Sequence, residues 1–241
     1  MRVTIGTAGW SLPRAEQEHF PGNGSHLERY AARFRAVEIN SSFHRSHRTT
    51  TWTRWRDSVP EDFRFSVKMP KTITHTNQLR DADELVASFL KEAGALGAKM
   101  GCLLVQLPPK LIFDAAVAEP FFRSLRARTT VAIACEPRHA SWFEAGADQL
   151  LKSWHVARAA ADPARVPAAE EPGGWRGLSY YRLHGSPKVY YSAYSAEFIA
   201  ALATRVREDA AAEREVWVIF DNTTLGAATR NALDLSRALQ L

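Results

Sequence analysis

The chain has 241 residues, a net charge of +5 and a hydrophobic fraction of 46 %, with 24 % charged residues. These values are ordinary for a soluble globular protein and exclude a disordered chain. No apolar run approaches the roughly 20 residues that a membrane-spanning helix needs. The stretch that follows Met1 resembles a strand and not the apolar region of a signal peptide, so we expect a cytoplasmic protein.

Strand-like runs alternate with helical patterns along the chain. The predicted strands cover residues 3–7, 37–40, 63–68, 101–106, 131–136, 155–161, 179–184 and 216–221. The predicted helices cover residues 25–34, 50–57, 83–95, a segment after 114, 145–154, 195–209 and 225–239. Ser25 and Glu28 form a capping-box signature, and Asp81, Asp114 and Ser195 are candidate N-caps.

Eight near-continuous apolar strands that alternate with helices indicate a parallel sheet covered by helices. Eight such units in 241 residues favour one α/β domain over residues 1–241, a closed (β/α)8 TIM barrel, regular or irregular. An open doubly wound sheet is the alternative, because the number of strands does not establish closure. The unpatterned stretch 162–177 is expected to be a lid or simply a mobile loop. Cys102 and Cys135 lie in apolar runs, which predicts buried reduced thiols.

Polar side chains gather at the ends of the predicted strands. Alternation along a strand places Glu38 and Asn40 on one face and Val37 and Ile39 on the other. A charge buried in mid-strand costs several kcal/mol unless it is paired, whereas at the C-terminal end of a barrel strand it meets water, a partner or a ligand. The groups in such positions are Glu38, Lys68, Gln106, Glu136, Arg182, His184 and, on a face that the pattern leaves open, Asp221. They predict an active site, with mutual neutralisation of charges as the alternative.

Eight short motifs cover the chain from end to end. They are residues 6–10 (GTAGW), 37–43 (VEINSSF), 63–68 (FRFSVK), 73–75 (ITH), 106–109 (QLPP), 136–142 (EPRHASW), 181–185 (YRLHG) and 220–223 (FDNT). In these motifs and their order the chain resembles the YecE-like family, known as domain of unknown function 72. The resemblance implies a TIM-barrel fold and no settled activity.

The chain departs from the family pattern in several motifs. Phe43-His44 stands where the family usually has Phe-Tyr, and Trp10-Ser11-Leu12 stands in a first loop that tends to read Trp-Ser-Tyr. Asp221 takes the place of the first asparagine in a motif that often reads Phe-Asn-Asn. The last departure puts in doubt any role that needs a neutral amide at position 221.

The favoured function is acid/base catalysis on a small anionic substrate, phosphorylated or carboxylated. The loops 185–188 and 222–226 follow the seventh and eighth strands, where barrels often bind phosphate. The predicted catalytic residues are Glu38, Lys68, Glu136, His184 and Asp221, with Glu136 and His184 as the acid/base pair. The predicted substrate-binding residues are Asn40, His75, Gln106, Arg138, His139, Arg182, Lys188 and Asn222. If Arg138 and Arg182 hold an anion, replacing Arg182 should cost little stability.

Four other functions remain open. Glu38, Glu136 and Asp221 are candidates for the two carboxylates of a glycosidase, whose separation the sequence does not give. Glu38, Glu136, His184 and Asp221 are ligand types that metal-dependent sugar isomerases and endonucleases use, but the neighbouring cations disfavour a dication, so we expect no metal and no cofactor. Lys68 is a candidate for Schiff-base chemistry. The basic chain and the interleaved segment 52–56 (WTRWR) are compatible with nucleic-acid binding, although tryptophans three residues apart also fit the core-facing stripe of a helix. No membrane partner is expected.

Overall fold

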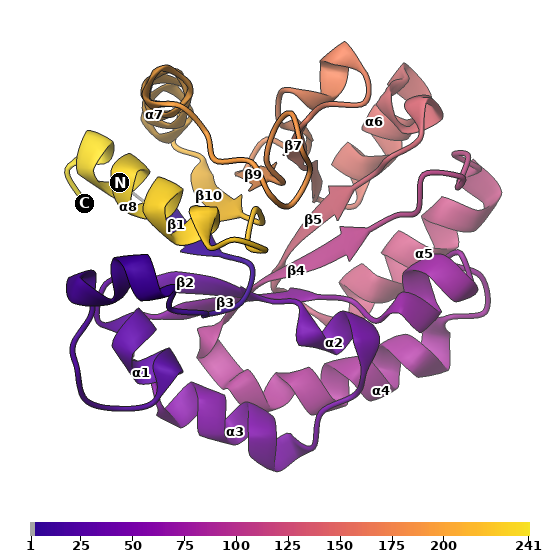
Figure 1. Ribbon diagram of the computed structural model, residues 1–241. Helices are drawn as coiled ribbons and strands as arrows, with labels where there is room; N and C mark the ends of the chain where they lie inside the picture. The colour runs from indigo at the N-terminus through magenta and orange to yellow at the C-terminus, as the bar shows by residue number, and fades with distance from the viewer. Residues whose placement is uncertain (1–2) are drawn as a thin grey trace.

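The computed structural model describes residues 3–241 as a mixed α/β fold with two parallel sheets (Figure 1). The first sheet has the order β1-β10-β9-β7 and the second β2-β3-β4-β5-β6-β8, with only the β6–β8 pair antiparallel. The strands are β1 (Val3–Thr7), β2 (Ala36–Ile39), β3 (Arg64–Lys68), β4 (Met100–Gln106), β5 (Ala132–Glu136), β6 (Val156–Arg158), β7 (Ala160–Asp162), β8 (Gly173–Gly174), β9 (Leu178–Leu183) and β10 (Glu215–Phe220). In the described range, no helix is both long enough and apolar enough to cross a membrane.

The two sheets adjoin at both of their edges. At one side, β6 and β7 are consecutive and only Ala159 separates them, so β6 pairs with β5 while β7 pairs with β9. At the other side, Ala8 forms an isolated parallel bridge with Glu38, and the Gly9 N–H donates to the Glu38 carbonyl at 2.8 Å. The predicted strands are therefore found, but their pairing gives two sheets and does not by itself confirm the closed barrel that the sequence favoured.

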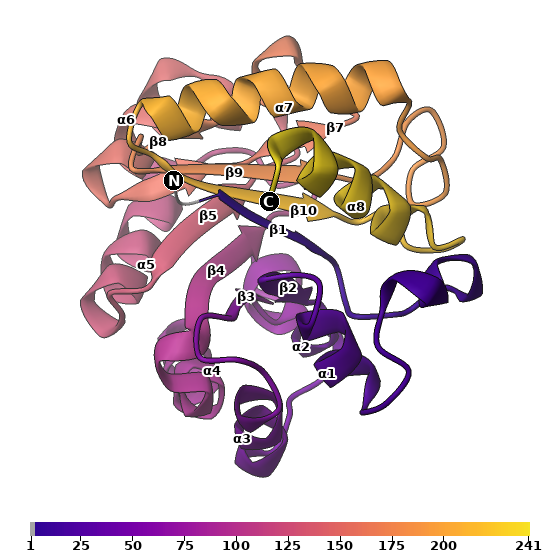
Figure 2. The same ribbon diagram turned by 90° about the vertical axis from the view of Figure 1, so that its left-hand side faces the viewer.

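Helices surround the strands, as Figures 1 and 2 show, with α3 and α4 on one side of the molecule and α7 and α8 on the opposite side. The main α-helices are α1 (His26–Ala31), α3 (Thr49–Asp57), α4 (Asp83–Ala93), α5 (Ala115–Arg128), α6 (Ala145–Ser153), α7 (Ala196–Ala211) and α8 (Ala227–Leu239). The remaining helical segments are η1 (Arg14–His19), α2 (Ser41–His44), η2 (Thr72–Thr76), η3 (Gly94–Lys99), η4 (Ala140–Phe143) and η5 (Pro167–Ala169).

Three of the four predicted helix caps are confirmed. Ser25 and Glu28 form a complete capping box, and the Asp114 and Ser195 side chains accept hydrogen bonds from the first turns of α5 and α7. The prediction for Asp81 is wrong. The residue before α4 is Ala82, and Asp81 has a φ of 46°, outside the extended conformation that an N-cap adopts.

Two apolar layers follow from the alternation along the strands. Outward residues such as Phe65 and Val67 pack against the helices. A smaller apolar cluster fills the space between the sheets, and there Tyr180 stacks on Trp217 with ring centroids 6.2 Å apart. The cluster shows which face of β10 points inward, because it contains Trp217 and Ile219. Asp221 continues the same alternation and therefore also lies on the inward face. The polar side chains at the C-terminal ends of the strands therefore lie next to a layer of apolar side chains that fills the space between the sheets.

The stretch 162–177 is partly fixed to the sheet. Its second half contains β8, which pairs with β6, and the Gly174 N–H donates to Asp148 Oδ1 at 2.8 Å. Residues 163–165 instead border a cavity of about 360 Å³ next to His184. Cys102 and Cys135 are buried and free, as predicted.

Candidate active site

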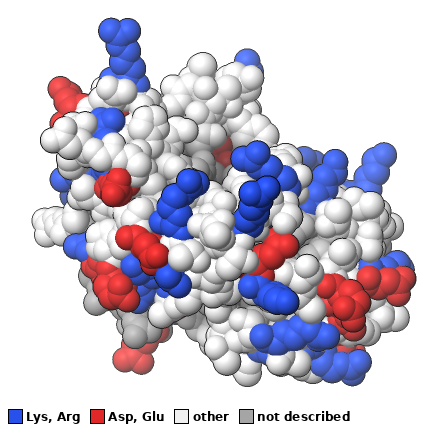
Figure 3. Space-filling view, turned by 90° about the horizontal axis from the view of Figure 1, so that it is seen from below, with Lys and Arg blue, Asp and Glu red and all other residues white. Residues whose placement is uncertain are grey.

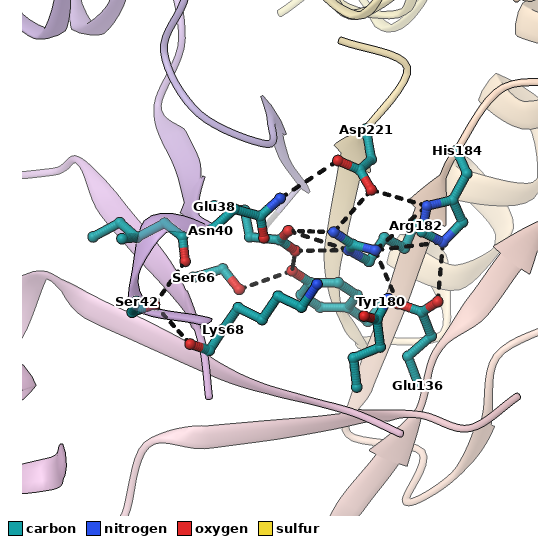
Figure 4. Close-up of polar contacts among 12 residues, drawn as sticks. Glu38, Asn40, Ser42, Ser66, Lys68, Glu136, Tyr180, Arg182, His184 and Asp221 are labelled. Carbon is teal, nitrogen blue, oxygen red and sulfur yellow. Dashed lines mark hydrogen bonds and ion pairs between the residues drawn. The ribbon is translucent and has the colours of Figure 1, made fainter. Parts of the chain in front are cut away.

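The centre of the site is the side chain of Arg182, which comes from β9 and is completely buried (Figure 4). Its Nη2 lies 2.8 Å from Glu38 Oε1 and 3.0 Å from Asp221 Oδ2, and its Nη1 lies 3.1 Å from Glu136 Oε2. The Tyr180 hydroxyl donates to Glu38 Oε2 at 2.9 Å. One guanidinium therefore faces three carboxylates, which come from β2, from β5 and from the residue after β10.

His184 joins two of these carboxylates. Its Nε2 lies 2.9 Å from Glu136 Oε1, and its Nδ1 lies 2.9 Å from Asp221 Oδ2. Both contacts are hydrogen bonds only when both ring nitrogens carry protons, because an ionised carboxylate can only accept. Arg138 adds a second guanidinium, with Nη2 at 2.9 Å from Glu136 Oε1. We call Glu38, Glu136, Arg182, His184 and Asp221 the Arg182 cluster.

The cluster keeps Glu136 and Asp221 ionised. Burial alone would raise the pKa of Glu136, but His184, Arg182 and Arg138 outweigh it and hold the pKa well below the usual range. Burial alone would also raise the pKa of Asp221, but Arg182 and His184 outweigh it and lower the pKa below its usual value. These two groups are therefore proton acceptors, not proton donors, at neutral pH.

The contacts of Arg182 overturn one expectation. We expected Arg182 to hold an anionic substrate, but the guanidinium is enclosed by Glu38, Glu136 and Asp221 and has no exposed surface. Arg182 therefore neutralises buried carboxylates. Arg138 differs, because its side chain keeps 19 % of its surface exposed, and within residues 3–241 no group accepts a hydrogen bond from its Nη1.

An open cavity of about 550 Å³ lies beside the cluster at the C-terminal ends of the strands. Its wall contains the cations Lys68, Lys71 and Arg138 and a single carboxylate, Asp221. We call it the Lys68 pocket; its lining is Asn40, Phe43, His44, Lys68, Lys71, His75, Gln106, Leu107, Pro109, Arg138, Tyr190 and Asp221. Arg138 and Tyr190 also line the cavity beneath residues 163–165.

Lys68 is the buried cation of this pocket. Its Nζ lies 4.2 Å from the centre of the Phe43 ring, and in the described part of the chain no carboxylate comes within ion-pair distance of it. Burial, together with the positive charge of Arg182, lowers the pKa of Lys68 to about 8. Burial and the nearby Lys68 also lower the pKa of His75 to about 4, so this imidazole is neutral at pH 7.

With this geometry in view, the comparisons with known proteins identify the family. The family model "Protein of unknown function DUF72" matches residues 4–241. This chain belongs to the DUF72 family. Over 106 residues it is 35 % identical to UPF0759 protein YecE of Escherichia coli K12, a match that covers 44 % of this chain and 38 % of that protein.

Two crystal structures of DUF72 proteins share the fold. The protein from Enterococcus faecalis V583 superposes with a TM-score of 0.83 at 23 % identity, over 99 % of this chain and 96 % of that one. The protein from Thermotoga maritima MSB8 gives a TM-score of 0.81 at 24 % identity, over the full length of both chains. At these identities the likeness concerns the fold alone.

The structure of this DUF72 chain brings ten of the thirteen predicted site residues together. They are the five members of the Arg182 cluster, and Asn40, Lys68, His75, Gln106 and Arg138 in the pocket wall. The other three lie elsewhere. His139 bonds to Ser141 near the start of η4, and Lys188 is exposed over the Tyr191 ring. Asn222 donates to the Ser192 carbonyl and to Asn231.

The expected phosphate site at the start of the last helix is also not formed as predicted. A Cβ atom at Gly226, which precedes α8, would overlap the ring of Pro13, so the first loop covers this helix end. The Gly226 and Ala228 N–H groups donate to the carbonyls of Thr223 and Asn222. These hydrogen bonds within the loop thus occupy backbone N–H groups that a bound phosphate would need as donors.

The sequence reasoning missed several residues of the site. The sequence pattern could have identified Tyr180 as a site residue, because it lies two residues before Arg182 on the inward face of β9. Its hydroxyl contacts Ser66 Oγ at 2.8 Å. Phe43, Lys71 and Tyr190 carried no such signal. They come from loops and short turns, whose positions are not set by strand alternation.

Proposed function

We propose that this chain is an enzyme that binds a small anionic substrate in the Lys68 pocket and acts on it by acid/base chemistry. The observation that carries the proposal is the charge of the wall. Lys68 and Lys71 have no carboxylate partner within residues 3–241, and Arg138 has an unused Nη1. Cations that no protein group neutralises favour a substrate with carboxylate or phosphate groups.

Candidate proton-transfer groups adjoin the same space. Asp221 lines the pocket and is held ionised by Arg182 and His184, so it can accept a hydrogen bond from a substrate, while its lowered pKa makes it a weak base. Neutral His75 also faces the pocket and bonds through Nδ1 to Thr74 Oγ1 at 2.8 Å, which leaves Nε2 for a ligand. Lys68, with a pKa of about 8, can donate or accept near neutral pH.

We further propose that the two sheets together form one irregular (β/α)8 barrel. The continuity of β6 and β7 across Ala159 and the Ala8–Glu38 bridge support it. So does the Arg182 cluster, because the side chains of β9 in the first sheet reach Glu38 and Glu136 in the second. In a barrel the pocket lies at the C-terminal mouth, the usual place of catalytic groups.

The test is anion binding, measured as the rise in melting temperature with phosphate, citrate and pyruvate. Removing the buried cation in Lys68→Met should weaken binding at least tenfold, since a charged hydrogen bond contributes about 1.5–3 kcal/mol. Lys71→Gln should weaken it less, because Lys71 is exposed. Lys91→Gln on α4 is the matched control. The proposal fails if none of the anions stabilises the parent or if the control weakens binding equally.

The nucleic-acid alternative lacks a surface of the expected kind in the segment that suggested it. Trp52 is 1 % exposed and packs on Trp55 and His47, so the two tryptophans form a core-facing stripe of α3. On the face that α1, α3 and α4 cover, Lys and Arg are interspersed with Asp and Glu (Figure 3). The metal alternative is also weakened, because Arg182 already occupies the space between the three carboxylates.

A further inference from the structure

Lys68 differs from the other cations of the site in being both buried and unpaired. Its side chain ends at the wall of an open cavity, where Nζ lies over the face of the Phe43 ring. Arg182 and Arg138, in contrast, each donate to carboxylates at 2.8–3.1 Å. Removing a proton from Lys68 Nζ therefore breaks no ion pair among residues 3–241.

A neutral amine in such a place is a nucleophile. A desolvated lysine beside another cation is the arrangement by which proteins activate an amine toward carbonyl groups. At the lowered pKa of about 8, roughly a tenth of the Lys68 side chains are neutral at pH 7, a far larger fraction than for an exposed lysine with an ordinary pKa.

The wall of the Lys68 pocket also contains groups that can bind the anionic part of a carbonyl compound. Arg138 Nη1 and Lys71 are free to bind a carboxylate or phosphate. Gln106 Nε2 donates to Glu136, while its amide oxygen is not engaged by any described residue. The pocket is open, so water can enter and leave during the reaction.

We propose that Lys68 forms a Schiff base with a small carbonyl compound that carries a carboxylate or phosphate group. This inference rests on the proposed function, because it uses the same pocket, and it names the substrate class. The Nζ lone pair attacks the carbonyl carbon and a C–N bond forms. The carbonyl oxygen then leaves as water with the two amine protons, and the imine nitrogen takes one proton from solvent.

The experiment is reductive trapping on the full chain. Protein is incubated with pyruvate, with dihydroxyacetone phosphate or with acetone, sodium cyanoborohydride is added, and adducts are mapped by peptide mass spectrometry. We expect at least tenfold more adduct at Lys68 than at the exposed Lys91 and Lys110, which serve as internal controls. The yield should rise from pH 7 to pH 9, through the pKa of Lys68. The two anionic probes distinguish a carboxylate from a phosphate substrate.

Acetone tests the anion requirement, because it has a methyl group in place of the carboxylate of pyruvate. Equal trapping of acetone and both anions would support the nucleophile and overturn the anionic substrate class. Anion-dependent stabilisation without an adduct at Lys68 would overturn the Schiff base and leave the proposed function standing. Lys68→Arg and Lys68→Met, checked for cooperative melting, should both lose the adduct. An undiminished adduct in a folded variant would assign it to another lysine.

Discussion

Two neighbouring regions of this molecule differ in how far their charged side chains are paired with one another. In the Arg182 cluster, three carboxylates surround one fully buried guanidinium, and His184 lies between two of them. In the adjoining Lys68 pocket, three cations share a wall with one carboxylate. In the Arg182 cluster the charges neutralise one another inside the protein. In the Lys68 pocket positive charge remains available to a ligand. Proximity to a strand end therefore does not by itself identify a catalytic group.

The largest expected contrast is in stability. Arg182→Met should lower the free energy of unfolding by about 3–5 kcal/mol, because it leaves Glu38, Glu136 and Asp221 without their shared cation. Lys68→Met should cost little or stabilise, since it removes a buried cation that has no ion-pair partner in the described part of the chain. Urea unfolding measures both. Arg182→Lys, which keeps the charge without the fork, should fall between the parent and Arg182→Met. Equal effects of the Arg182→Met and Lys68→Met changes would remove the distinction between the two regions.

The next contrast is in pH dependence. The folded pKa of Lys68 is about 8 against an ordinary 10.5, so between these pH values the unfolded chain binds more protons and stability rises with pH. Below pH 8 both states are protonated, and the folded state carries the whole penalty, about 3 kcal/mol.

The parent minus Lys68→Met difference in unfolding free energy isolates this effect from the other titrating groups. It should increase from pH 8 to pH 10 and stay constant between pH 6 and pH 7. Lys91→Met, at an exposed position, provides the control and should show a flat difference. A flat profile for Lys68 as well would mean that its amine is solvated like that of a surface lysine.

The smallest effect concerns Asp221, which belongs to both regions. Asp221→Asn should cost about 1 kcal/mol, because Arg182 keeps Glu38 and Glu136 and the amide oxygen can still accept from His184. It also removes the single carboxylate of the pocket wall, so phosphate should bind a few-fold more tightly. Urea unfolding and phosphate titration measure the two effects. Weaker phosphate binding would show that Asp221 is needed to shape the pocket.

The sequence by itself determined which side chains point between the sheets. Alternation along a strand is a local property, so Glu38, Lys68, Glu136 and Arg182 could be assigned to the inward face without knowing any partner. The caps at Ser25, Asp114 and Ser195 were readable for the same reason, because each bonds within three residues. The family motifs added the order of these elements over the whole chain.

Only the tertiary structure decided how those side chains are paired. Arg182 and Glu38 are 144 residues apart, and whether the guanidinium faces a ligand or three carboxylates depends on strands that no local pattern places. The same holds for His139, Lys188 and Asn222, which stand on loops and turns whose paths are set by their own contacts. The lowered pKa of Lys68 likewise arises from burial and from Arg182, and both exist only once the chain has folded.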